Sequence, residues 1–258
     1  MRSLKVLVAT KIVADSKVEP KLKDGAVNKT GVERVIDFAD EASIQAALDL
    51  KRKLAGVSVA VVSVGPIHDR DALRHALAMG TDEVVQVRLV PDLIHTVDSF
   101  CVAKLLRRLV IMTECDMILT GSRSSDTGSG QVGTDLAGLL GWPHLSSVYA
   151  LTELKPDKVL ASCRLSGWAI SCWLPLPCVL VCDIKVSGPK LVDILDLIKA
   201  KNGVWELKLF ISLTPTWASA LLLKSAYQLR SSDSSACFMV CSKPAWSLAS
   251  DLIVLDAS

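Results

Sequence analysis

The sequence has few aromatic residues, almost no net charge and no long apolar run. Aromatic side chains make up 5% of the 258 residues while half of all residues are apolar, a composition that suits the Val-, Leu- and Ala-rich core of an α/β protein. The net charge is +2, from 29 basic and 27 acidic residues, so the chain lacks the electrostatic footprint of a nucleic-acid-binding protein. No apolar run has the length of a membrane helix, and Met1–Lys11 is typical of a strand rather than a signal peptide, so we expect no membrane insertion.

The sequence also lacks C-x-x-C pairs and an obvious set of catalytic residues. The four His lie apart in sequence from the eight Cys, so we predict no metal site and expect free thiols in a reducing compartment. There is no Ser-His-Asp order and no pair of carboxylates that a cleft would bring together, so no catalytic residue is assigned. The eight cysteines are Cys101, Cys115, Cys163, Cys172, Cys178, Cys182, Cys237 and Cys241.

What the first half contains is an alternation of short apolar runs with helical patterns. This alternation predicts βαβ units, and hence a parallel sheet with helices on both faces. Ligands of such sheets bind at the carboxyl ends of the strands, where Thr10, Ser63 to Gly65 and the segment after Gly121 should meet at one rim. The expected strands are Leu4–Ala9, Val57–Val64, Val84–Val90 and Asp116–Leu119, and the expected helices are Ala42–Leu54, Asp69–Met79 and Asp98–Ile111.

The most informative stretch runs from Ile118 to Trp142, where a strand pattern leads through a loop of Ser, Gly and Thr into a helical pattern. Unpaired backbone N–H groups and the helix dipole at such a junction suit a phosphate. Four glycines within thirteen residues (Gly121, Gly128, Gly130 and Gly133) let a ligand approach the backbone closely. The spacing fits neither G-x-x-x-x-G-K-[ST] nor G-x-G-x-x-G, so the prediction is an anion or nucleotide site of another kind, with an exposed loop that binds nothing as the alternative.

Two charged residues near this loop have several interpretations. Asp126 repels phosphate, so it could accept from a ribose hydroxyl, cap the following helix or hold the loop by an Asx-turn. Lys11, directly after the first strand, could face a phosphate or lie in solvent.

The second half has a different texture. Four strand-like runs, Ser146–Leu154, Lys158–Cys163, Trp168–Leu174 and Leu176–Val181, precede a helical patch at Leu191–Lys201. In that patch Ile194, Leu195 and Ile198 should be exposed. No periodic pattern is found from Gly203 to Ser258, a tail that packs on another subunit or is poorly specified.

Several motifs together resemble the electron transfer flavoprotein β subunit, including its FixA-like relatives. The opening L-K-V-L-V-A-T-K, the helix D-E-A-S-I-Q-A-A-L-D-L-K, the turn V-S-V-G-P and the segment L-R-H-A-L-A-M-G-T-D-E are similar to that family. So are the central S-S-D-T-G-S-G-Q-V-G, the strand L-P-L-P-C-V-L-V-C-D and G-P-K-L-V-D-I-L-D-L-I-K-A-K. The similarity is nearly continuous to Lys201. It implies a nucleotide-binding α/β domain (1–186), a partner-recognition segment (187–201) and a C-terminal arm that packs on the partner subunit (202–258).

The resemblance implies a three-layer α/β/α adenine-nucleotide-binding sandwich with a mostly parallel sheet and a C-terminal arm. It implies a heterodimer with an α subunit that holds or shares FAD, and electron transfer from flavin-dependent dehydrogenases to a quinone reductase or other acceptor. The β subunit would bind structural AMP, or a second FAD in its place. It would lie in the mitochondrial matrix in a eukaryote and in the cytoplasm otherwise. Partner dehydrogenases would dock at Ile194 and Leu195. The implied nucleotide-binding residues are Ala9, Asp37, Phe38, Ala39, Asp40, Val64, Gly121, Ser122, Arg123, Ser124, Ser125, Asp126, Thr127, Gly128, Ser129, Gly130, Gln131 and Val132.

The chain departs from the family pattern at three places. Asp37-Phe38-Ala39 replaces Asn-Pro-Phe, the segment C-R-L-S-G-W-A-I from Cys163 to Ile170 has lost its acidic residues, and Leu195 replaces a proline. Two alternatives to the electron-transfer role remain: a nucleotide-sensing module without redox chemistry, and an ATP-using enzyme of the same architecture.

Overall fold

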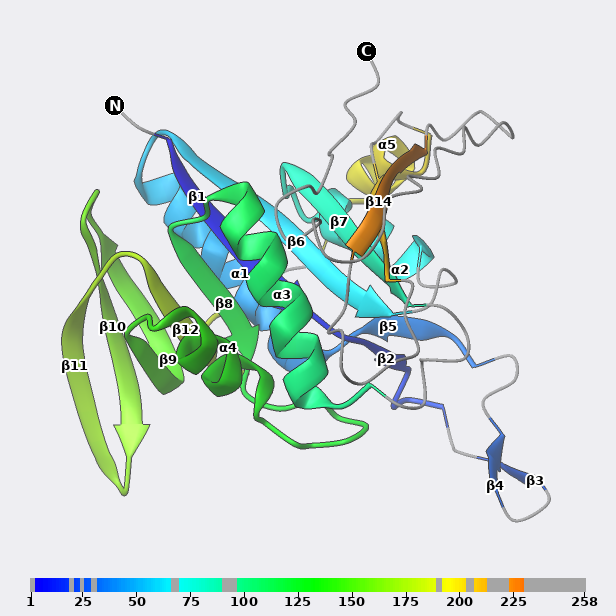
Figure 1. The fold of residues 1–258 in the computed structure, drawn as a ribbon, viewed down its shortest axis with the longest axis horizontal. Coiled ribbons are helices and arrows are strands. Elements are labelled where there is room, and N and C mark those ends of the chain that lie inside the picture. The colour runs from blue at the N-terminus through cyan, green and yellow to red at the C-terminus, as the bar shows by residue number, and fades with distance from the viewer. Residues whose placement is uncertain are drawn as a thin grey trace, which may run out of the picture.

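A ten-stranded sheet forms the centre of the protein in the computed structural model, which describes residues 3–18, 21–23, 26–28, 32–65, 70–89, 97–188, 192–202, 207–212 and 223–229 (Figure 1). The strand order is β11-β10-β9-β12-β8-β1-β6-β7-β13-β14. These strands are β1 (Leu4–Thr10), β6 (Val57–Gly65), β7 (Glu83–Leu89), β8 (Met117–Gly121), β9 (His144–Leu154), β10 (Lys158–Leu165), β11 (Trp168–Pro175), β12 (Cys178–Cys182), β13 (Leu207–Ser212) and β14 (Leu223–Leu229).

The middle of the sheet is parallel and its two edges are antiparallel. The seven strands from β9 to β13 in the sheet order pair in parallel, whereas β10 and β11 at one edge and β14 at the other run antiparallel to their neighbours. Two small two-stranded sheets lie outside it, β2 (Ile12–Ala14) with β5 (Arg34–Ile36), and β3 (Lys21–Lys23) with β4 (Ala26–Asn28). The second of these is a short antiparallel hairpin.

Helices cover both faces of the sheet, which confirms the predicted three-layer α/β/α sandwich (Figure 1). On one face α1 (Phe38–Lys53) and α2 (Arg70–Ala78) enclose a core that contains Ile44 and Leu73. On the other face α3 (Ser99–Thr113) and α4 (Val132–Leu140) enclose a second core that contains Leu106 and Leu136. The strands between the two cores are buried on both sides, as expected for their continuous apolar runs. A fifth helix, α5 (Ile194–Asn202), contacts α2.

The helix boundaries follow local signals in the sequence. Asp37 caps the N-terminus of α1, where its carboxylate accepts from Ala39 N, and Asp98 caps α3 by accepting from Cys101 N. Three basic residues occupy the last turn of α1, where they complement the helix dipole. Gly80 follows α2 with a φ of +108°, a conformation that favours glycine. These signals are local, so the sequence placed the helices to within a few residues.

The C-terminal segment contains two strands, although its sequence predicted no helix or strand after Gly203. Strand β13 pairs in parallel with β7, and β14 pairs antiparallel with β13, so part of the segment extends the sheet. An edge strand offers unpaired backbone groups to any segment that can reach it, and this pairing needs no periodic sequence pattern. Residues 203–206, 213–222 and 230–258, which form most of the predicted arm, lie outside the described residues. That the arm packs on a partner subunit stays a prediction.

Candidate functional site

The carboxyl ends of the central parallel strands meet at one edge of the sheet. Thr10 of β1 lies beside Ser63 of β6, and Ala9 lies beside Thr120 of β8. The end of β12 lies beside Gly121 of β8. The register therefore brings the three predicted segments to a common rim, from which the loop 121–131 leads into α4.

The first attachment of this loop is the buried carboxylate of Asp40 on α1. Asp40 Oδ1 accepts from Gly121 N at 2.9 Å, and Oδ2 accepts from Lys11 N at 2.7 Å. The side chain thus joins the ends of β8 and β1. Burial, reinforced by the neighbouring carboxylate of Asp37, raises the pKa of Asp40 to about 7, although the two backbone N–H groups oppose this shift.

The second attachment is the carboxylate of Asp37, which is 3% exposed. Besides capping α1, it accepts through Oδ2 from Ser125 N at 2.7 Å and from Ser125 Oγ at 2.6 Å. The middle of the loop is therefore fixed to the start of α1. Between these two carboxylates Ala39 is buried, while the ring of Phe38 is 42% exposed at the rim.

The third attachment is made by Lys11, whose ammonium lies among three oxygens of the loop. Its Nζ is 2.6 Å from Asp126 Oδ1 and 3.1 Å from Thr127 Oγ1, and it reaches Ser124 Oγ at 3.4 Å. Partial burial favours the neutral acid, but the hydrogen bonds from Lys11 and Ser124 outweigh it and lower the pKa of Asp126. Among the interpretations of Asp126, helix capping does not apply, since Gln131 is the N-cap residue of α4 and makes no side-chain capping bond.

Glycines shape the end of the loop and the start of α4. Gly130 has a φ of +64°, and a Cβ on it would lie 2.9 Å from Ser122 O. Gly133 in the first turn of α4 lies so close to the sheet that a Cβ would be 2.5 Å from Thr120 Oγ1 and 2.6 Å from Val181 Cγ2. The uncapped N-terminus of α4 is thereby held directly above β8 and β12, where its backbone N–H groups can bind an anion.

A cavity of about 320 Å³ lies beside the loop. Four of its lining residues carry hydroxyl groups, one carries a guanidinium group, and the glycines expose backbone. The residues are Ser122, Arg123, Gly128, Ser129, Gly130, Ser146, Ser147 and Val181. This polar lining suits the phosphate and sugar of a nucleotide.

Three residues that line this cavity, Ser146, Ser147 and Val181, are not among the predicted site residues. The pairing of β9 with β12 shifts at this point, and Ser147 adopts a φ of +55°. Such a bulge turns a strand locally and redirects its side chains. In the sequence the two serines are typical of the start of a regular strand, and no neighbouring residue predicts the bulge.

The remaining predicted nucleotide residues are not brought into this cavity. Ala9 is buried and Val64 half-buried, and both side chains belong to the core beneath α3 and α4. Val132 packs against the same core, while Gln131 is exposed. The Ser129 hydroxyl, which does line the cavity, also lies 2.9 Å from that of Ser99 at the start of α3.

The two predicted partner-recognition residues lie elsewhere. Ile194 and Leu195 begin α5 and are 71% and 62% exposed. In Figure 1, α5 lies at the upper right of the view and α4 at the lower left.

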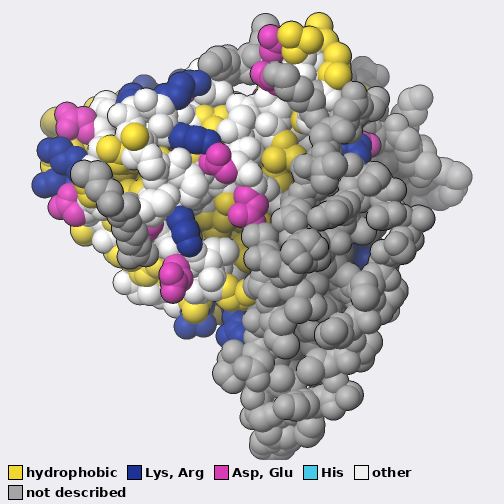
Figure 2. Space-filling model, turned by 90° about the horizontal axis from the view of Figure 1, so that it is seen from above, with side chains coloured by type: hydrophobic (Ala, Val, Ile, Leu, Met, Phe, Trp, Pro, Cys, Tyr) yellow, Lys and Arg dark blue, Asp and Glu magenta, His cyan; other side chains and the backbone are white. Residues whose placement is uncertain are grey.

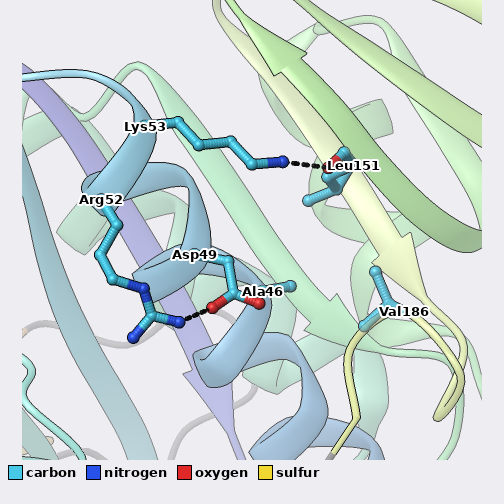
Figure 3. A pocket seen from close by; sticks show the side chains of 6 residues that line it. All are labelled: Ala46, Asp49, Arg52, Lys53, Leu151 and Val186. Carbon is cyan, nitrogen blue, oxygen red and sulfur yellow. Dashed lines mark hydrogen bonds and ion pairs between the residues drawn. The ribbon is translucent and has the colours of Figure 1, made fainter.

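A second pocket, of about 260 Å³, contains none of the predicted nucleotide residues (Figure 3). It lies between α1, β9 and the segment after β12. Lys53 Nζ bonds the carbonyl of Thr152 at 3.2 Å, and Arg52 pairs with Asp49. Asp49 also accepts from Gln45 and Ser187, so its carboxylate is committed to internal contacts.

Charges of both signs are mixed on the described part of the surface. On that part of the face in Figure 2, Lys and Arg side chains are interspersed with Asp and Glu, without a large patch of one sign. No group of three or more His, Cys, Asp and Glu in the described ranges could hold a metal ion. None of the described helices combines the length and apolar character needed to cross a membrane.

Comparisons with known proteins agree on one family. The model of the electron transfer flavoprotein domain matches residues 24–203. The chain is 31% identical over 206 residues to the mitochondrial electron transfer flavoprotein subunit beta of Oryza sativa subsp. japonica, covering 78% of this chain and 80% of that protein. It is 29% identical over 208 residues to the subunit beta of Dictyostelium discoideum, covering 80% of each chain, and 30% identical over 204 residues to that of Homo sapiens, covering 78% and 80%.

Proposed function

This chain belongs to the electron transfer flavoprotein family, among its β subunits, and we propose that it acts as the β subunit of a heterodimer that carries electrons. In this proposal the α subunit holds or shares FAD, which supplies the redox chemistry when bound. Electrons come from flavin-dependent dehydrogenases and pass to a quinone reductase or another acceptor. The β subunit contributes structure and docking rather than catalytic residues.

We place a structural AMP at the rim formed by the loop 121–131. The observation that carries this proposal is the fit of the loop: Gly133 seats the uncapped N-terminus of α4 on the sheet, next to a cavity of about 320 Å³ lined by hydroxyl groups. The backbone N–H groups of the first turn of α4 and the Ser122 and Ser129 hydroxyls would bind the phosphate. Arg123, the guanidinium in the lining, would balance its charge.

A second FAD in place of AMP would use the same rim, because the two molecules share an adenosine monophosphate moiety. The neighbouring exposed ring of Phe38 is a surface on which a planar ring could stack. We favour AMP, and the bound nucleotide can be identified directly.

The exposed apolar residues at the start of α5 support a docking role. Ile194 and Leu195 form an apolar pair at the helix end, with Leu197 and Ile198 also exposed behind them. Such a patch suits the apolar surface of a partner protein. We assign it to the dehydrogenases, and in a eukaryotic cell we place the heterodimer in the mitochondrial matrix.

The first test is to co-express the chain with its cognate α subunit, purify the pair and identify the released nucleotides by chromatography and mass. One FAD and one AMP for each heterodimer would support the proposal. Two FAD for each heterodimer would mean that a second flavin occupies the site in place of AMP. A stable chain that binds ATP and no flavoprotein partner would overturn the redox role and favour a nucleotide-sensing module or an ATP-using enzyme.

A further inference from the structure

The two carboxylates at the start of α1 are turned into the protein, where all four of their oxygens accept hydrogen bonds. Asp37 and Asp40 are 3% and 7% exposed. Each of their four oxygens accepts at least one hydrogen bond, from Ala39 N, Ser125 N, Ser125 Oγ, Gly121 N and Lys11 N. Because both side chains are almost completely buried and directed at these internal donors, they offer almost no surface to a ribose or a base.

The partners of these carboxylates are spaced along the loop. Asp40 holds Gly121, where the loop begins, and Asp37 holds Ser125, four residues further on. Asp40 also holds the backbone of Lys11, whose ammonium reaches Asp126. The loop 121–131 is thus tied to β1 and α1 at three consecutive points before it turns into the glycines and α4.

The backbone of the loop is fitted closely to one of these carboxylates. A Cβ on Gly121 would overlap Asp40 Oδ1 and lie 3.0 Å from the Ala39 Cβ. Only glycine can approach α1 in this way, so this position and Asp40 form a matched pair. The charged and titratable groups that face Asp40 are Asp37 on its own helix, Lys11 at the end of β1 and the Cys182 thiol of β12.

We propose that Asp37 and Asp40 are positioning residues that hold the loop 121–131 in its binding conformation and do not touch the nucleotide. The inference rests on the proposed nucleotide site, and it changes the role of two residues that the family resemblance assigns to direct contact. A loop that is ordered before the ligand arrives loses less conformational entropy on binding, so removing the ties should weaken affinity.

The chain offers a matched pair of variants to test this. Asp37→Asn keeps a good N-cap acceptor but replaces one oxygen by an NH₂ group, which cannot accept from Ser125 N. Asp98→Asn makes the same change at the N-cap of α3, where the carboxylate accepts from Cys101 N. Asp40→Asn likewise sets a donor against Gly121 N or Lys11 N.

Two measurements on the full-length chain, expressed with its α subunit, test whether the carboxylates hold the loop and whether this affects nucleotide binding. Hydrogen exchange without added nucleotide reports whether the loop is held. In Asp37→Asn we expect faster exchange only for the backbone amides of 121–131. In Asp40→Asn the amide of Lys11 should also exchange faster. Asp98→Asn should exchange like the wild type. Titration with AMP should show dissociation constants raised about tenfold in the first two variants alone.

A double-mutant cycle tests whether Asp37 acts through Ser125 rather than through general stability. Ser125→Ala should weaken AMP binding in the wild type but add little in the Asp37→Asn background. Unchanged loop exchange, additive losses, or AMP binding that persists in both Asp variants would overturn the positioning role. If the wild type binds no nucleotide, the proposed function fails, and the exchange data alone then decide whether the carboxylates hold the loop.

Discussion

Asp40 accepts a hydrogen bond from Gly121 N at 2.9 Å across 81 positions of sequence. This hydrogen bond lies at the ends of β1 and β8, which are neighbours in the sheet. After β1 the chain adds β6 and β7 on one side, and after β8 it adds β12 and β9 on the other. Ligands of open α/β sheets bind at this switch point, at the carboxyl ends of the strands. A buried carboxylate at this place therefore controls the geometry of the candidate site.

The stability of the protein should depend on pH through Asp40. Since the pKa rises from its ordinary value of 3.8 to about 7, the folded chain binds this proton more tightly than the unfolded chain between those values. Between about pH 4 and 7 Asp40 is ionised in the unfolded chain and protonated in the folded chain. The free energy of unfolding therefore falls over this range, by at most about 4 kcal/mol, and Asp40 causes no further fall above pH 7. Urea denaturation of the wild type and Asp40→Asn at several pH values measures the difference.

The control for this experiment is Asp98→Asn. The hydrogen bond from Cys101 N lowers the pKa of Asp98, so its contribution is present above its unfolded value and is lost as pH falls through the folded one. The two carboxylates should therefore give pH dependences of opposite sign. A constant difference between wild type and Asp40→Asn from pH 4.5 to 7.5 would contradict the role of burial.

Two glycines of α4 should respond oppositely to the same substitution. Gly133→Ala places a methyl group 2.5 Å from Thr120 Oγ1 and 2.6 Å from Val181 Cγ2, so the helix must move off the sheet. We expect a loss of about 1–3 kcal/mol in the free energy of unfolding. Gly138 has open space around its Cβ position, and Gly138→Ala should raise that free energy by about 0.5–1 kcal/mol. Chemical denaturation compares the two, and equal effects would show that α4 is not closely packed at Gly133.

The bulge at Ser147 should tolerate glycine better than a β-branched residue. Its φ of +55° is left-handed, a conformation that Val enters at a cost of about 1–2 kcal/mol and that glycine enters freely. Ser147→Val should lower the melting temperature, whereas Ser147→Gly should preserve or raise it. If both variants melt alike, the backbone at this position is not left-handed in solution.

The exposed start of α5 should matter for partner proteins and not for folding. Changing Ile194 and Leu195 together to Ser removes apolar surface that is already exposed, so the melting temperature should stay within a few degrees of the wild type. Reduction of the heterodimer by a flavin-dependent dehydrogenase should become slower, mainly through a higher KM for the heterodimer. Ile184→Ser, at another exposed isoleucine, is the matched control. Equal rates in all three proteins would remove α5 from the docking surface.

The sequence determined the elements of the main domain and the place of the candidate loop. Apolar runs such as Val57–Gly65 and Met117–Gly121, and capping residues such as Asp37 and Asp98, are local signals that act within a few residues. The position of the small-residue loop after a strand and before a helix follows from the same signals. So does the three-layer arrangement, since alternating strands and helices leave few other topologies.

Tertiary structure alone decided which side chains act together. Lys11 meets Asp126 across 115 positions and Asp37 meets Ser125 across 88, and each contact depends on the order and register of β1 and β8. The bulge that brings Ser147 to the cavity and the pairing of β13 with β7 depend equally on neighbouring strands. From the sequence alone, a carboxylate on an amphipathic helix that faces water cannot be distinguished from one that accepts from a buried backbone N–H. The physical reason is that its partner is chosen by the packing of distant segments, which no local pattern encodes.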